Sequence, residues 1–210
     1  MLLLGSCRLW LIGSSIVYWA SKGISSRSGG PHLGLQKVGG YISWFEKRGM
    51  RWDEFNKFID LTLRKSPPPS FIIIQLGSND LGLTKSWQLF TDIECDLLRL
   101  RALQPDVIII WSDILQRRYW HNATDGKAME RTHKRVNLLV RNLVLSFVGC
   151  VIRHCNIRAR EINLFRCNGT HLSNLGIDIY LNNIQGALER FLSFEGSLVF
   201  PPMQPSENGV

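Results

Sequence analysis

Three side chains of complementary chemistry lie at the ends of expected strands or helices of this chain. Ser15 closely follows the apolar run 9–12, and Asn79 follows the run 71–76. His171 lies in the segment NGTH, just before the last expected helix. A serine hydroxyl becomes a nucleophile when a base lies within hydrogen-bond reach, and the oxyanion that it forms on a carbonyl needs fixed donors. These residue types predict acyl-transfer chemistry if the fold brings them together.

The elements expected to position these side chains alternate between strand and helix. We expect strands at 8–12, 41–45, 71–76, 106–111 and 151–153, and helices from 15 onward and at 52–65, 86–103, 126–147 and 173–194. Most of the strands are continuously apolar, which is typical of parallel strands covered on both faces. The order predicts a three-layer α/β domain with a doubly wound, mainly parallel, five-stranded sheet. Ligand sites in such sheets lie beyond the carboxyl ends of the strands.

One domain accounts for a chain of this size. The sequence has 210 residues, of which 45% are hydrophobic, enough for one substantial core. We expect the domain to cover residues 1–196 and the proline-containing tail 197–210 to be disordered.

Four segments, in this order, resemble the sequence blocks of the SGNH, or GDSL-like, hydrolases, and especially the versions in vertebrate retroelement-type open reading frames. The segments are IGSSIV at 12–17, RGMRWDEF at 48–55, LGSNDLG at 76–82 and NGTHLSNLG at 168–176. The similarity extends from about Arg8 to Phe194. It implies a flavodoxin-like sheet and a serine esterase that acts on acetyl or short acyl esters of a small molecule, carbohydrate or lipid.

The resemblance also implies a role for individual residues. Ser15 matches the nucleophile and His171 the general base. The oxyanion would be held by the Ser15 N–H, the Gly49 N–H and the Asn79 side chain. The resemblance implies no metal and no cofactor.

Two positions depart from the family pattern. Ser14 stands where the first block usually has an aspartate, and Asn168 stands where the last block has the aspartate that orients the histidine. In a protease triad, the same change from aspartate to asparagine lowers turnover by about 10⁴. If the Asn168 oxygen faces His171, it can still accept the ring proton; if the amide nitrogen faces it, the base is misoriented.

Other interpretations of these residues stay open. Ser15 could cap a helix, Asn79 and Asp80 could form an ordinary turn, and His171 could be a surface residue. The chain could also be a catalytically inactive binding module with the same fold. Segment 117–166 carries 11 Lys and Arg against 3 Asp and Glu, so nucleic acid is a candidate partner, and a solvated basic face is the alternative.

The cysteines and the N-terminus indicate the compartment. Five cysteines in no framework spacing favour reduced thiols and an intracellular, cytoplasmic location. The spacing of the potential zinc ligands Cys150, Cys155, Cys167 and His171 matches no common zinc pattern. The apolar N-terminus lacks the preceding positive charge of a signal peptide, and no run is long enough for a membrane helix.

Overall fold

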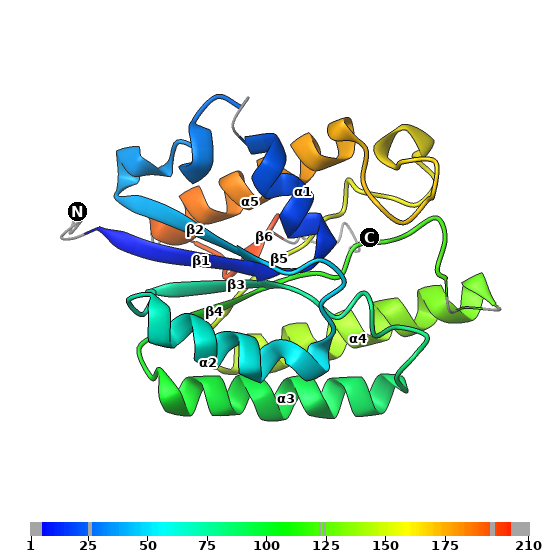
Figure 1. Ribbon diagram of the computed structural model, residues 1–210, viewed down its shortest axis with the longest axis horizontal. Coiled ribbons are helices and arrows are strands. Elements are labelled where there is room, and N and C mark those ends of the chain that lie inside the picture. The colour runs from blue at the N-terminus through cyan, green and yellow to red at the C-terminus, as the bar shows by residue number, and fades with distance from the viewer. Residues whose placement is uncertain (1–5, 25–26, 122, 124, 194–195, 203–210) are drawn as a thin grey trace, which may run out of the picture.

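Six parallel strands form one sheet in the computed structural model (Figure 1), which describes residues 6–24, 27–121, 123, 125–193 and 196–202. The strands are β1 (Cys7–Gly13), β2 (Gly40–Glu46), β3 (Phe71–Gln75), β4 (Ile108–Ser112), β5 (Cys150–Ile152) and β6 (Val199–Phe200). Their order across the sheet is β2-β1-β3-β4-β5-β6, and every neighbouring pair is parallel. The expected α/β fold with a parallel sheet is confirmed.

The sheet has six strands where the sequence predicted five. The additional strand, β6, lies in the segment expected to be disordered. It pairs Val199 with Val151 and Phe200 with Ile152. A strand of two residues has no periodicity from which it could be recognised, and it exists because the edge of β5 offers main-chain partners. The rest of that tail, 203–210, lies outside the described residues, as do residues 1–5 of the apolar N-terminus.

Helices cover both faces of the sheet (Figure 1). One face carries α1 (Ser15–Gly23) and α5 (Asn174–Leu192), and the other carries α2 (Phe55–Lys65), α3 (Ser86–Leu103) and α4 (Gly126–Ser146). Short 3₁₀ turns lie at Gly30–His32, Leu35–Val38, Trp52–Glu54 and Ile162–Leu164. Continuous apolar strands are therefore buried on both sides, as the sequence pattern indicated.

The pleat of each strand divides its side chains between two cores. In β1, Leu9 and Leu11 pack with α1 and α5, while Trp10 and Ile12 pack with α2 and α3. Alternate residues of β3 divide in the same way. Since successive side chains of a strand point to opposite faces, a strand covered twice must be apolar at every position.

The chain changes direction across the sheet at β1. It goes from β1 to β2 on one side and then crosses to β3 on the other. Gly13, at the end of β1, pairs with Glu46 of β2 and with Gln75 of β3, so these three strands end side by side. A crevice at such a switch point is where open α/β sheets bind ligands. The segments that follow these three strands contain Ser15, Gly49 and Asn79.

Candidate active site

Ser15 lies where β1 turns sharply into α1. A Cβ atom on Gly13 would lie 2.4 Å from Val17 Cγ2 and 2.6 Å from the Gln75 carbonyl oxygen, so the turn requires glycine. Ser14 is the N-cap of α1, but its side chain makes no capping bond. Ser15 is the first helical residue and is 7% exposed. Its Oγ has no hydrogen-bond partner among the described residues, so Ser15 does not cap the helix.

Gly49 lies in a turn after β2. The Met50 N–H donates to the Lys47 carbonyl at 3.1 Å, and Gly49 adopts φ of +73°. A positive φ at the third position of a β-turn is typical of type II and favours glycine. Within the described part of the chain, the Gly49 N–H has no acceptor and its residue is exposed. A free main-chain donor therefore lies beside the end of β1.

Asn79 follows β3, and its amide is held at both ends. Its Nδ2 donates to the Met50 carbonyl at 3.1 Å, and its Oδ1 accepts from Arg117 Nη2 at 3.0 Å. The same Arg117 nitrogen donates to Ser78 Oγ at 2.8 Å. These partners fix which end of the amide is nitrogen. An amide nitrogen has two protons, and within the described residues only one of them is used.

Asp80 ties the loop after β3 to the loop after β2. It is 2% exposed, and both of its oxygens lie 3.1 Å from the Trp52 N–H that donates to them. Arg51 Nε lies 3.5 Å from Asp80 Oδ1. Burial raises the pKa of Asp80 to about 6, although the Trp52 N–H and Arg51 oppose this. Sequence reasoning treated Asp80 only as a turn residue, and nothing in the sequence reveals this buried contact.

His171 lies on a short loop that is closed by its own main chain. Phe165 and Leu172 form an antiparallel bridge, and the Arg166 N–H donates to the His171 carbonyl at 2.8 Å. The Arg166 guanidinium stacks over Trp19 of α1, 3.9 Å from the ring centroid. This cation–π contact connects the histidine loop to the helix that begins at Ser15.

The Asn168 amide presents its nitrogen to the His171 ring. Asn168 Oδ1 accepts from the main-chain N–H groups of Thr170 and His171, each at 3.1 Å. Its Nδ2 lies 2.8 Å from His171 Nδ1 and donates to it. In a neutral imidazole whose Nδ1 accepts, Nε2 carries the proton. The ring therefore offers an N–H on Nε2, whereas a general base needs a lone pair there.

Positive charges surround this imidazole. Burial lowers the pKa of His171, and the charges of Arg117, Arg166 and Arg48 lower it further. No carboxylate is among these influences. The ring is therefore neutral at physiological pH.

Three of the predicted site residues lie at one edge of the sheet, and two arginines relate His171 to them. Ser15, Gly49 and Asn79 follow three adjacent strands, and Arg117 and Arg166 link Asn79 and α1 to the surroundings of His171. No hydrogen bond joins Ser15 Oγ to the His171 ring. Among the described residues, the Gly49 N–H and one Asn79 amide proton thus have no acceptor, and the Ser15 hydroxyl has no partner.

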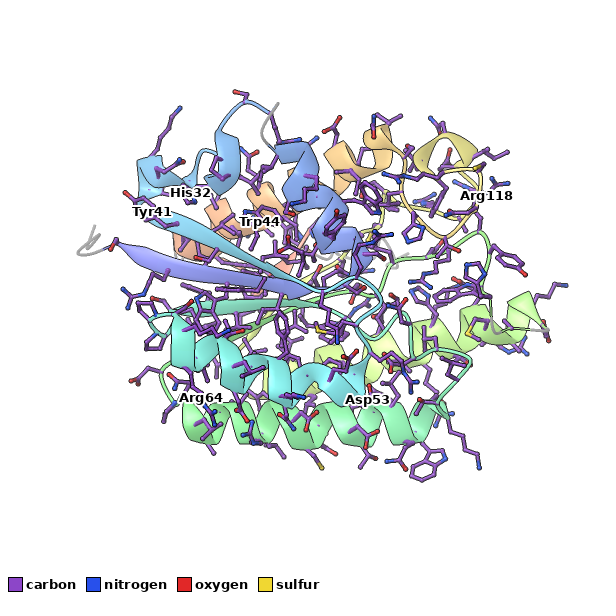
Figure 2. All side chains as sticks on the ribbon, in the orientation of Figure 1. His32, Tyr41, Trp44, Asp53, Arg64 and Arg118 are labelled. Atoms are coloured by element: carbon purple, nitrogen blue, oxygen red, sulfur yellow. The ribbon has the colours of Figure 1, made fainter. Side chains whose placement is uncertain are left out.

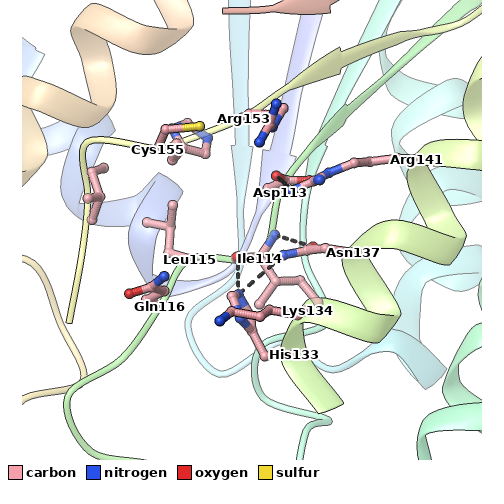
Figure 3. Close-up of a pocket in the computed structure, with 12 residues that line it drawn as sticks. Asp113, Ile114, Leu115, Gln116, His133, Lys134, Asn137, Arg141, Arg153 and Cys155 are labelled. Carbon is pink, nitrogen blue, oxygen red and sulfur yellow. Dashed lines mark hydrogen bonds and ion pairs between the residues drawn. The ribbon is translucent and has the colours of Figure 1, made fainter. Parts of the chain in front are cut away.

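A separate polar cavity of about 290 Å³ lies at the ends of β4 and β5 (Figure 3) and contains none of the predicted site residues. In its wall, Arg141 of α4 binds both oxygens of the buried Asp113. His133 Nε2 lies 2.6 Å from the Ile114 carbonyl, to which it donates. These contacts anchor α4 to the end of β4.

The basic segment divides into inward and outward groups. Arg117 and Arg141 turn inward to the partners named above. Four exposed cations share one side of α4, at Lys127, Arg131, Lys134 and Arg135. Lys134 is paired with Glu130 at 3.4 Å. Figure 2 shows Arg118 on the loop before α4, at the end of the molecule opposite Arg64 of α2.

The described residues contain no group of three or more His, Cys, Asp and Glu side chains that could hold a metal ion. The five cysteines are free, and Cys150 is the buried one. Within the same residues, no helix has the length and apolar character needed to cross a membrane.

No family model matches the chain, and no curated protein gives a significant match. Solved structures match its fold. A GDSL-like lipase from Bacteroides thetaiotaomicron has a TM-score of 0.66 at 16% identity, with 89% of each chain covered. A member of the lipolytic G-D-S-L family from Veillonella parvula has a TM-score of 0.66 at 14% identity, covering 87% of this chain and 98% of its own. The acetyl xylan esterase AlAXEase has a TM-score of 0.62 at 14% identity, covering 86% and 99%. The chain therefore has the fold of the GDSL-like hydrolases.

Proposed function

We propose that this protein is an SGNH-type serine hydrolase of acetyl or short acyl esters whose turnover is limited by Asn168. The observation that carries this proposal is the set of unpartnered groups at one switch point. Within the described ranges, the Ser15 hydroxyl, the Gly49 N–H and one Asn79 amide proton have no partner there, at the ends of β1, β2 and β3. The structural similarity to lipases and to an acetyl xylan esterase supports ester chemistry.

The proposed reaction has two halves. Ser15 Oγ attacks the ester carbonyl and gives its proton to His171 Nε2, while the Ser15 N–H, the Gly49 N–H and Asn79 Nδ2 stabilise the oxyanion. The C–O bond to the alcohol then breaks, and the alcohol leaves with the proton from His171. Water attacks the acyl-serine in the same way and releases the acid, which regenerates Ser15.

Asn168 opposes the first proton transfer. With Nδ2 donating to Nδ1, the neutral His171 ring carries its proton on Nε2 and cannot accept another from Ser15 there without losing the Asn168 contact. The His171 imidazolium that forms when Ser15 loses its proton would also have no neighbouring carboxylate to stabilise its charge. We therefore expect slow turnover in the protein with its own sequence.

The test is hydrolysis of a short-chain chromogenic ester by the protein and by Ser15→Ala. Ser14→Ala is the matched control, because Ser14 is an adjacent buried hydroxyl whose side chain makes no capping bond. We expect Ser15→Ala to lose the activity and Ser14→Ala to keep most of it. Equal rates for the protein and Ser15→Ala would refute the serine mechanism.

A second candidate is a catalytically inactive module that binds anions, and the Asn168 nitrogen facing His171 favours it. The four exposed cations on α4 offer a surface for phosphates of nucleic acid. Binding of a labelled single-stranded oligonucleotide, measured over a range of salt, tests it. Phosphate contacts require binding that weakens steeply with salt and with Arg131→Gln; affinity that is insensitive to both would exclude this candidate.

A further inference from the structure

Three arginines lie near the proposed catalytic groups, and the charge of each lowers the pKa of His171. We call them the arginine cluster: Arg48, Arg117 and Arg166. Arg48 immediately precedes Gly49 in the turn after β2. Arg117 donates to Asn79 Oδ1 at 3.0 Å, and the Arg166 main-chain N–H donates to the His171 carbonyl at 2.8 Å. The cluster therefore lies near the proposed site and is distinct from the exposed cations of α4.

Aromatic side chains hold the guanidinium groups near the site. The Arg166 group lies 3.9 Å and the Arg48 group 5.8 Å from the centroid of the Trp19 ring. Arg48 also lies 5.3 Å from the Tyr18 ring. Both rings belong to α1, the helix that begins at Ser15. Stacking on an aromatic face positions a guanidinium while its edge stays available for hydrogen bonds.

The charge of the cluster is not balanced by acids. Five other arginines of the described chain form ion pairs with carboxylates: Arg27, Arg51, Arg99, Arg141 and Arg160. None of the three cluster arginines does so within the described ranges. Arg117 is the most enclosed of them, and burial lowers its pKa to about 10, so it remains a cation at neutral pH. Like charges gathered near one another without an acid repel, and an anionic ligand relieves that repulsion.

We infer that the site takes an ester that carries its own anionic group, a carboxylate or a phosphate, and that the arginine cluster binds this group. The inference rests on the proposed function and adds the substrate class to it. Guanidinium groups bind carboxylate and phosphate through paired N–H donors, which neutral acetyl esters cannot use. The anionic group can lie on the acyl side or on the alcohol side of the ester, and each arrangement can be tested.

The first test compares ester pairs that differ in one negative charge. 4-Nitrophenyl hydrogen succinate is compared with 4-nitrophenyl butyrate for the acyl side, and 4-acetoxybenzoate with phenyl acetate for the alcohol side. At low salt we expect one anionic ester to be preferred in kcat/KM by about tenfold, and salt to reduce this preference. Arg48→Gln should lower the preference several-fold. Arg64→Gln removes the same charge from the far end of α2 (Figure 2) and should leave the preference unchanged.

The second test measures binding without turnover. The Ser15→Ala protein is titrated calorimetrically with 4-acetoxybenzoate, with 4-nitrophenyl hydrogen succinate and with their neutral partners. Tighter binding of an anionic ester supports the inference even if hydrolysis is too slow to follow. This binding should weaken in the double variant Ser15→Ala/Arg48→Gln and stay the same in Ser15→Ala/Arg64→Gln. Equal binding of anionic and neutral esters overturns the inference. Serine-dependent hydrolysis with no preference for the anionic esters would overturn the inference and leave the proposed function intact. Tighter binding of an anionic ester without serine-dependent hydrolysis would support the anion site and overturn the proposed function.

Discussion

Replacing Asn168 with aspartate should activate the enzyme. Aspartate Oδ1 can keep the bonds from the Thr170 and His171 N–H groups, and Oδ2 can accept from Nδ1–H, which leaves Nε2 with a lone pair that can accept a proton. Asparagine reaches that arrangement only by turning its amide over, which breaks both main-chain bonds. At about 1 kcal/mol for each bond, this costs roughly 2 kcal/mol, or about 30-fold in rate.

The missing charge adds to this cost. A carboxylate beside Nδ1 stabilises the imidazolium that forms when Ser15 loses its proton, and the complete effect in a protease triad is about 10⁴. We therefore expect Asn168→Asp to raise kcat by about 10² to 10⁴. The added charge should also raise the pKa of His171, which burial and neighbouring arginines now lower, so the acid limb of the rate profile should move to higher pH.

The assay is hydrolysis of a neutral chromogenic acetate from acid to alkaline pH. Asn163→Asp is the matched control, because it makes the same chemical change at an exposed position near the same loop. The double variant Ser15→Ala/Asn168→Asp should be inactive. Peptide mapping of the purified protein must show that the side chain of Asn168, which precedes Gly169, has not deamidated to a carboxylate. An Asn168→Asp rate within about threefold of the original, or an equal gain in Asn163→Asp, would refute the tautomer argument.

Three further substitutions test individual contacts. Arg117→Met removes an enclosed cation that has no carboxylate partner among the described residues, so calorimetry should show an unchanged or higher Tm. The kcat/KM for ester hydrolysis should fall at least about tenfold, because the Asn79 amide loses the partner that holds its oxygen. A clearly lower Tm would contradict this reasoning. The folded protein binds a proton on Asp80 between pH 3.8 and about 6 that the unfolded chain has already released, so this group lowers the unfolding free energy by up to about 3 kcal/mol as pH rises through that window. Urea unfolding of Asp80→Asn at roughly pH 4.5 and pH 7 should lack this change, and a slope equal to that of the parent would exclude it. Arg141→Met leaves the Asp113 carboxylate buried and unpaired and should cost about 3–5 kcal/mol in urea unfolding, most of which Asp113→Asn should restore in the double variant.

The strands and helices were predictable because their signals are local. Strand β3 is apolar at its first four positions, and Gly77 and Ser78 follow one residue after its end, so both its type and its approximate end could be read from the sequence. Most predicted elements begin and end within two residues of the observed ones. β6 was missed because its two residues depend entirely on pairing with β5.

The positions of Ser15 and Asn79 in the fold were also predictable, but the contacts of the candidate site were not. Ser15 and Asn79 follow neighbouring parallel strands, so the topology alone places them at one edge. The orientation of the Asn168 amide depends on two main-chain N–H groups that only the folded loop brings together. Likewise, Arg117 was counted in a basic run, since no periodicity in a loop indicates whether a side chain turns inward.

The two main-chain donors that hold Asn168 Oδ1 have a consequence for how this chain evolves. Asparagine and aspartate can both accept these two bonds, so the exchange of one for the other keeps the main chain of the loop in place. A single substitution can therefore alter the chemistry of His171 without rebuilding the loop that carries it.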